Sequence, residues 1–266
     1  MKTVLTIAGS DCSGGAGIQA DLKTMIANGC YGMSVITSLT AQNTTGVRSV
    51  LNSDPAFLSD QIDAVFEDIV PDAVKTGMIA SKELVEVTAE RLKFYGVKNI
   101  VADPVMVATS GADLSNSESV KALRKSLIPL ASVVTPNIPE AEVLSGMKIS
   151  SRDDMTKACR KINAECGCSV LIKGGHNGSD CDDVLLHDGK VYIFEMKKID
   201  NPNTHGTGCT LSSAIACNLA KGMTVPEAVK RAKEYITGAI KAGLDLGHGR
   251  GPLDHGYDIT TEFKNT

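Results

Sequence analysis

The sequence predicts an α/β fold in which helices cover both faces of a mostly parallel β-sheet. Short β-rich segments alternate with helical segments along the chain, an order typical of parallel strands joined by crossover helices. The dipeptide Asp188-Gly189 separates two further β-rich runs and predicts a tight antiparallel hairpin. No linker, low-complexity segment or internal repeat divides the 266 residues, so we expect a single domain over residues 1–266.

The expected strands are short β-rich runs, and the expected helices carry boundary signals. Strands are expected at 3–8, 32–40, 73–76, 98–102, 132–135, 169–173, 182–187 and 190–195. Helices, with their caps, are expected at 18–28, 55–69, 81–95, 151–165, 209–222 and 224–242. Ser81 is a typical N-cap, while Ser151 and Thr224 each open a capping-box pattern. The tail from Gly243 is expected to be loop.

The composition argues against nucleic-acid and membrane partners. The net charge is −4, no cluster of Lys and Arg stands out, and Trp is absent, so no nucleic-acid footprint is expected. No apolar run is long enough to span a membrane. The start, MKTVLTIAGS, leads into a glycine loop and not into a cleavage site, and the eight cysteines are scattered, which favours reduced thiols in the cytoplasm.

The first candidate motif is the glycine loop Gly9–Gly17, which follows the first expected strand. It lacks the closing Gly-Lys-Ser/Thr of a P-loop, and its glycines do not fit the dinucleotide-binding spacing. It can wrap a ligand closely, or it can be a simple strand-to-helix turn. Asp21 is expected on the first turn of the next helix, either as a surface acid stabilised by the helix dipole or at the ligand pocket.

The second motif, HGTGC at residues 205–209, runs from a glycine-rich turn into a helix. Free amides and a positive dipole end meet there, so Gly206–Cys209 can form a cradle for a phosphate. The same field favours thiolate, and we expect Cys209 to be more acidic than an ordinary cysteine. The alternative is a glycine turn followed by a small buried Cys.

Further polar residues follow other strands, where ligands of such folds bind. The amide of Gln42, just past the second strand, can pair with the edge of an aminopyrimidine, or it can be a solvated loop residue. Asp103 and Glu140 are candidate partners of Mg²⁺ through waters, and Asn137 is placed near phosphate. Lys173, before two glycines, can place its ammonium against a triphosphate.

Taken together, seven segments carry a family resemblance. They are IAGSDCSGGAGIQADLK (7–23), TAQNT (40–44), KTGM (75–78), DPVM (103–106), TPNIPE (135–140), KGGH (173–176) and HGTGCT (205–210). The chain resembles the ribokinase superfamily, and closely the hydroxymethylpyrimidine/phosphomethylpyrimidine kinases of thiamin biosynthesis. The resemblance covers essentially the whole chain.

The resemblance implies a three-layer αβα, ribokinase-like kinase that uses ATP and Mg²⁺. It would phosphorylate 4-amino-5-hydroxymethyl-2-methylpyrimidine and then its monophosphate, giving the diphosphate. The implied substrate pocket comprises Gly9, Ala16, Asp21, Gln42, Met78 and Val105. The implied catalytic residues are Cys209, Gly206, Gly208 and Lys173; those for ATP are Asn137, Lys173 and Thr207; those for metal are Asp103 and Glu140.

In this branch Cys209 would take the proton from the substrate hydroxyl, or orient that hydroxyl. A phosphate acceptor, with a second pKa of about 6, has little need of a base. We therefore expect Cys209 to matter more for the first phosphorylation than for the second.

Three alternatives remain. Pyridoxine/pyridoxal kinases of the same branch share the glycine loop, KTGM and the Gly-x-Gly-Cys turn, and Gln42 is the residue that favours a pyrimidine. A ligand-binding protein without catalysis is disfavoured by the intact candidate residues, and a dehydrogenase by the glycine spacing. The resemblance also suggests a homodimer, and Ala108–Ala112 is the candidate lid.

Overall fold

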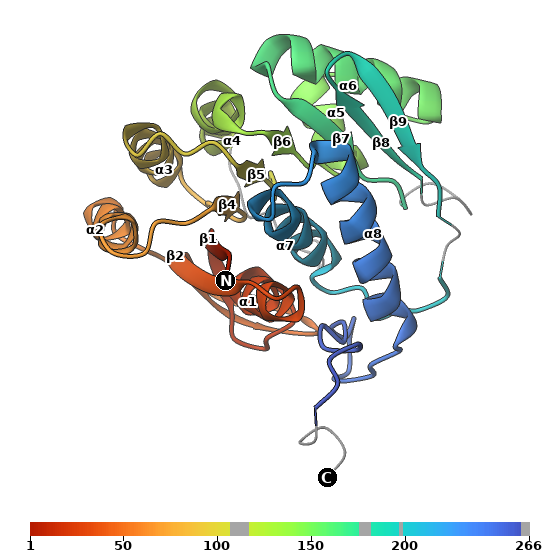
Figure 1. Ribbon diagram of the computed structural model, residues 1–266, viewed down its shortest axis with the longest axis horizontal. Coiled ribbons are helices and arrows are strands. Elements are labelled where there is room, and N and C mark those ends of the chain that lie inside the picture. The colour runs from red at the N-terminus through yellow and green to blue at the C-terminus, as the bar shows by residue number, and fades with distance from the viewer. Residues whose placement is uncertain (107–116, 176–181, 197–198, 262–266) are drawn as a thin grey trace.

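The computed structural model describes residues 1–106, 117–175, 182–196 and 199–261. Nine strands form one sheet in the order β3-β2-β1-β4-β5-β6-β7-β8-β9 (Figure 1). The six strands from β2 to β7 in this order pair in parallel, while β3, β8 and β9 are antiparallel to their neighbours. The predicted mostly parallel sheet is therefore confirmed. The single domain over 1–266 stays a prediction that this one sheet supports.

The strands and helices alternate along most of the chain. The strands are β1 (Thr3–Asp11), β2 (Tyr31–Asn43), β3 (Gly46–Asn52), β4 (Ala73–Thr76), β5 (Ile100–Ala102), β6 (Val133–Val134), β7 (Ser169–Ile172), β8 (Asp183–His187) and β9 (Lys190–Phe194). The helices are α1 (Gly17–Ala27), α2 (Pro55–Phe66), α3 (Lys82–Phe94), α4 (Ser117–Ala122), α5 (Ile138–Ser145), α6 (Arg152–Cys166), α7 (Thr207–Ala220) and α8 (Val225–Lys241).

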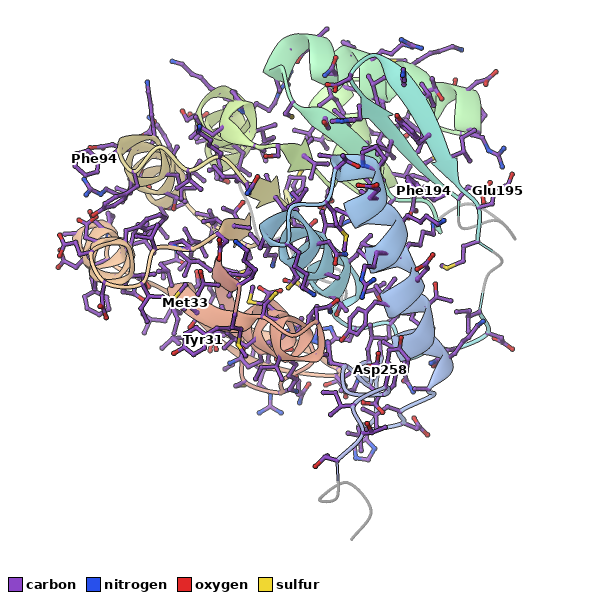
Figure 2. All side chains as sticks on the ribbon, in the orientation of Figure 1. Tyr31, Met33, Phe94, Phe194, Glu195 and Asp258 are labelled. Carbon is purple, nitrogen blue, oxygen red and sulfur yellow. The ribbon has the colours of Figure 1, made fainter. Side chains whose placement is uncertain are left out.

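Two apolar cores lie on the two faces of the sheet. Val4 of β1 packs with α1, α7 and α8, whereas its neighbours Leu5 and Ile7 contribute to the core under α2 to α6. This alternation follows from the two-residue period of a strand. Side chains fill the space between the sheet and both helical layers (Figure 2). The three-layer αβα architecture is confirmed.

The largest differences from the sequence prediction lie at the edges of elements. β2 runs on to Asn43 and pairs with β3, so Gln42 lies within a strand and not in a loop past its end. No local signal marks β3, because most of its residues are exposed and carry no apolar periodicity. The helical turns at 117–130, which include a π-helical turn at Leu123–Leu127, were also not predicted.

The parallel strands bring their carboxyl ends to one edge, next to the start of α7.

The predicted hairpin is confirmed, with β8 and β9 joined by Asp188 and Gly189, both at positive φ. From Gly243 the described chain forms no helix or strand, although Pro252 forms an isolated bridge with His205. Among the described helices, none combines the length and apolarity needed to cross a membrane.

Candidate active site

The mouth of α7 has the geometry of an anion cradle. Gly206 is the N-cap at φ 80°, and no side chain caps the helix. A Cβ on Gly206 would lie 1.9 Å from the carbonyl oxygen of Gly15, so only glycine allows the two glycine loops to meet. The amides of the first helical turn have no partner within the helix and favour a bound anion.

An ion pair between the residues that directly follow β5 and β7 borders this mouth. Lys173 Nζ donates to Asp103 Oδ1 at 2.8 Å, and a Cβ on Gly208 would lie 3.2 Å from the same Nζ. Thr135 and Ser212 donate their hydroxyls to the two oxygens of Asp103. Burial alone would raise the pKa of Asp103, but the ammonium groups of Lys173 and Lys75 and the hydrogen bonds from Lys173 and Thr135 together outweigh it, and the pKa is lowered. Asp103 is therefore a carboxylate beside the cradle.

Glu140 completes the polar group at this edge. It forms a capping box with Asn137: Glu140 N donates to Asn137 Oδ1 at 2.9 Å, and Asn137 N donates to Glu140 Oε2 at 2.8 Å. The amide of Met106 donates to the other carboxylate oxygen at 3.4 Å. Burial raises the pKa of Glu140 to about 7, although Lys173 acts in the opposite direction. A cation nearby would favour its ionised form.

These carboxylates would hold Mg²⁺ through waters. Both are already hydrogen-bonded, and no cluster of three or more His, Cys, Asp or Glu side chains suited to a metal occurs in the described part of the chain. Mg²⁺ keeps several waters and uses one or two carboxylates together with substrate phosphates. Asp103 and Glu140 are two carboxylates of the kind that would hold such a hydrated Mg²⁺ beside substrate phosphates.

The expectation that Cys209 is unusually acidic is wrong. Burial raises the pKa of its thiol to about 11, and Asp21 and Asp103 push in the same direction while Lys75 opposes them. The ammonium of Lys75 and a backbone hydrogen bond from Gly17 do not compensate for the loss of solvation. Cys209 is therefore a thiol at neutral pH in the free protein.

The position expected for Asp21 is also wrong. It lies beyond the first turn of α1, which has no acidic residue, and its side chain is 0% exposed. Lys75 Nζ donates to both of its oxygens at 2.8 and 3.0 Å, and Thr6 and Ser213 donate their hydroxyls. Asp21 is therefore not a surface acid, and its place in the substrate pocket stays a prediction. Ser213 is one turn beyond Cys209 on α7 and donates its hydroxyl to Asp21, so the buried ion pair is anchored to that helix.

Of the other predicted substrate residues, Gly9, Ala16 and Met78 lie on or beside the first glycine loop, and Val105 lies just after β5. A Cβ on Gly9 would lie 2.9 Å from Met78 Cε, so these two residues are in contact range. Ala16 is the N-cap of α1. Val105 follows Asp103, whose carbonyl accepts its amide hydrogen bond. The Thr207 hydroxyl donates to Thr204 O at 2.6 Å, so it is engaged within the turn.

A match to known proteins identifies the family. A family model described as phosphomethylpyrimidine kinase matches residues 11–254. The chain belongs to the phosphomethylpyrimidine kinase family. It is 48% identical to the hydroxymethylpyrimidine/phosphomethylpyrimidine kinase of Streptomyces coelicolor, over 96% of this chain and 95% of that protein. It is 50% identical to the thiamine biosynthesis bifunctional protein ThiED of Geobacter sulfurreducens over 95% of the chain, but spans only 52% of that longer protein.

A solved structure shows the same fold with a different named activity. The ADP complex of Bacillus subtilis pyridoxal kinase superposes with a TM-score of 0.90 at 42% identity, and covers 97% of this chain and 98% of that one. Phosphomethylpyrimidine kinases and pyridoxal kinases thus share this architecture. The choice of acceptor depends on residues of the pocket and not on the fold.

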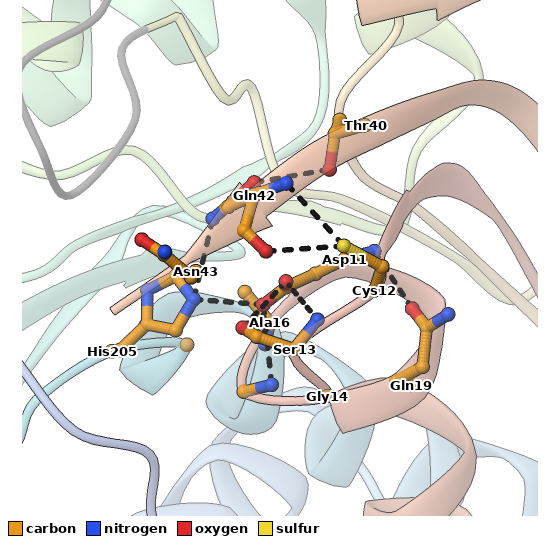
Figure 3. Close-up of polar contacts among 12 residues, drawn as sticks. Asp11, Cys12, Ser13, Gly14, Ala16, Gln19, Thr40, Gln42, Asn43 and His205 are labelled. Carbon is orange, nitrogen blue, oxygen red and sulfur yellow. Dashed lines mark hydrogen bonds and ion pairs between the residues drawn. The ribbon is translucent and has the colours of Figure 1, made fainter. Parts of the chain in front are cut away.

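Two site residues of this phosphomethylpyrimidine kinase family member are not evident from the sequence alone. Asp11 and His205 are both buried, and His205 Nε2 lies 2.8 Å from Asp11 Oδ2 (Figure 3). Asp11 also accepts hydrogen bonds from the amides of Ser13, Gly15 and Ala16, and so shapes the glycine loop. The Asp-x-Ser spacing, typical of an Asx turn, was the available signal for Asp11. The candidate lid Ala108–Ala112, and His176 of the KGGH motif, lie outside the described residues.

Proposed function

We propose that this protein transfers the γ-phosphoryl group of ATP to the hydroxymethyl group of 4-amino-5-hydroxymethyl-2-methylpyrimidine, and a second one to the resulting monophosphate, in thiamin biosynthesis. One observation carries the proposal: the uncapped mouth of α7 lies beside the Lys173–Asp103 pair. An amide cradle beside an ammonium is what a transferring phosphoryl group requires. The kinase names of the relatives agree with it.

The chain's residues divide the work of phosphoryl transfer. The amides of Gly206, Gly208 and Cys209 hold the phosphoryl oxygens, and the ammonium of Lys173 offsets their charge. Asn137 and Thr207 lie near the nucleotide phosphates. Mg²⁺, held through waters by Asp103 and Glu140, would neutralise charge that develops on the β- and γ-phosphates.

Cys209 acts on the acceptor. Since its thiol is protonated at neutral pH, it orients the substrate hydroxyl by a hydrogen bond and does not act as a thiolate base. Gly9, Ala16, Met78 and Val105 line the pocket around the pyrimidine, and Gln42 pairs with its amino edge. Asp21 supports α7 through the hydrogen bond from Ser213.

A pyridoxal kinase is the second candidate, favoured by the close superposition on the Bacillus subtilis enzyme. We would measure ADP formation with hydroxymethylpyrimidine, its monophosphate and pyridoxal as separate acceptors. The proposed function predicts turnover of the first two, with kcat/KM for pyridoxal lower by at least about tenfold. Turnover of pyridoxal without turnover of the monophosphate would establish the second candidate instead.

We also propose that the protein is a homodimer in the cytoplasm. Leu39 of β2 and Leu51 of β3 are directly paired, and they are 51% and 68% exposed. Such a cross-strand apolar pair on an edge ribbon favours a partner. Sedimentation velocity should give the mass of two chains, and Leu51→Lys should shift it toward one; a single-chain mass for the native protein would reject the dimer.

All seven described cysteines are free thiols, which agrees with the proposed cytoplasmic location, a reducing compartment.

A further inference from the structure

A chain of three polar side chains, of which Asp11 and His205 are buried, links the two glycine loops to Gln42. His205 Nε2 lies 2.8 Å from Asp11 Oδ2 and 3.3 Å from Gln42 Nε2 (Figure 3). On its other side, the Gln42 amide meets the hydroxyl of Thr40, whose Oγ1 is 3.2 Å from Gln42 Oε1. His205 is 163 residues from Gln42 in sequence and directly precedes the Gly206 turn. It therefore joins the acceptor side of the site to the phosphate side.

The proton on His205 is fixed by Asp11. Burial would raise the pKa of Asp11, but hydrogen bonds from His205, Ser13 and Ala16 outweigh it and lower the pKa. Asp11 is thus a carboxylate, which can only accept hydrogen bonds. His205 Nε2 must carry the proton and donate it to Asp11, so this nitrogen cannot also accept a hydrogen bond from Gln42.

The hydroxyl of Thr40 imposes the same restriction at the other end of the amide. Its single proton is donated to the carbonyl oxygen of Ser10 at 2.7 Å, the shorter of its two contacts. The hydroxyl oxygen is then free only to accept a hydrogen bond from Gln42. Both neighbours therefore favour one orientation of the amide, with its NH₂ toward Thr40 and its oxygen toward His205. The two ends of a carboxamide are nearly alike in shape, and the network decides between them.

We propose that His205, held by Asp11, is a specificity-determining residue that fixes the Gln42 amide with its oxygen on the His205 side; this inference rests on the proposed function. The amide oxygen then accepts from the exocyclic amine of the pyrimidine, and the amide NH₂ donates to the neighbouring ring nitrogen. The amine is placed toward His205 and the ring nitrogen toward Thr40. The hydroxymethyl group is next to the amine on the ring, so it is directed toward the Gly206–Cys209 turn, where the phosphoryl group is held. An acceptor with the reversed donor and acceptor order is rejected.

The probe for this inference is 5-hydroxymethyl-2-methylpyrimidin-4-one, which presents an oxygen and a ring N–H in place of the amine and ring nitrogen. The measured quantity is the ratio of kcat/KM for the amine over the oxo compound. In the native protein the ratio is expected to exceed about 100, because a mismatched buried pair leaves polar groups unsatisfied. His205→Leu removes the group that holds the amide. The Gln42 amide can then flip, and the ratio should fall at least tenfold. His205→Gln keeps an N–H donor toward Asp11 and should keep most of the ratio.

The matched control is His255→Leu. Like His205, His255 is buried and lies near the start of α7: it contacts Thr210 Oγ1 at 3.0 Å. It should lower stability or kcat without changing the ratio. A ratio unchanged in His205→Leu, with kcat reduced, would show that His205 is merely structural and would overturn the inference.

Two further measurements keep the test decisive. If His205→Leu does not fold, Thr40→Val removes the acceptor at the other end of the amide while suiting a strand, and the ratio should again fall; an unchanged ratio would reject the inference. Calorimetric binding of both compounds gives the ratio of their Kd values without turnover. Preferential binding of the amine that is lost in His205→Leu, without phosphorylation by the native protein, would reject the proposed function and still support the role of His205. Equal binding of the two compounds by the native protein, or a Kd ratio unchanged in His205→Leu, would reject that role.

Discussion

Replacing Lys75 with methionine is expected to lower the free energy of unfolding by about 3–5 kcal/mol, the usual cost of removing one partner of a buried ion pair. Lys75 and Asp21 are both fully buried, and Nζ lies 2.8 Å from Oδ2. In the variant, only the hydroxyls of Thr6 and Ser213 would remain to stabilise the Asp21 carboxylate. The loss should be visible as a lower urea midpoint with an unchanged slope.

The double variant Lys75→Met, Asp21→Asn is the control for this prediction. It removes both charges, so it should be more stable than Lys75→Met alone, and the difference measures the uncompensated charge. A loss below about 1 kcal/mol in Lys75→Met, typical of an exposed ion pair, would contradict the assignment of a buried pair beneath α7.

Replacing Cys209 with alanine is expected to slow the first phosphorylation by about 10- to 100-fold in kcat, and the second by much less. The first acceptor is a neutral hydroxyl that must be oriented. The second acceptor is a phosphate, which already carries its charge and has no proton for the thiol to direct. Cys209→Ser should retain most of the first activity, because a hydroxyl can make the same hydrogen bond.

The pH profile separates orientation from base catalysis. Burial raises the pKa of the Cys209 thiol to about 11. If the thiolate were the required base, kcat/KM for the first step would rise about tenfold per pH unit from pH 7 to 9. A hydrogen-bonding thiol predicts a nearly flat profile over this range. A tenfold slope that disappears in Cys209→Ala, or equal loss of both steps in that variant, would contradict the orienting role of the thiol.

The sequence could predict most of the fold because its helices and strands carry local signals. Capping boxes, glycine stops and the Asp188-Gly189 turn act over a few residues, and they located the elements and the hairpin. The motifs at strand ends likewise could be assigned to one edge of the sheet. Gly206, Gly208, Lys173 and Asp103 are brought together there as expected.

The parts that could not be predicted depend on distant partners. From the sequence, Asp21 is indistinguishable from an ordinary acid on a helix. Its ion pair with Lys75, 54 positions away, is evident only from the structure. The pairing of Asp11 with His205 spans 194 positions. The acidity of Cys209 depends on a balance between helix end and desolvation, and the sequence reveals only the first. The roles of Gly9, Ala16, Met78, Val105, Asn137 and Thr207 in binding stay predictions.

The most direct test of the bifunctional assignment is the amount of ADP formed when hydroxymethylpyrimidine is limiting and ATP and Mg²⁺ are in excess. A single site that performs both phosphorylations predicts about two ADP per acceptor molecule, with the monophosphate appearing first and the diphosphate at the end. A reaction that stops at one ADP per acceptor, or that proceeds only with pyridoxal, would contradict that assignment.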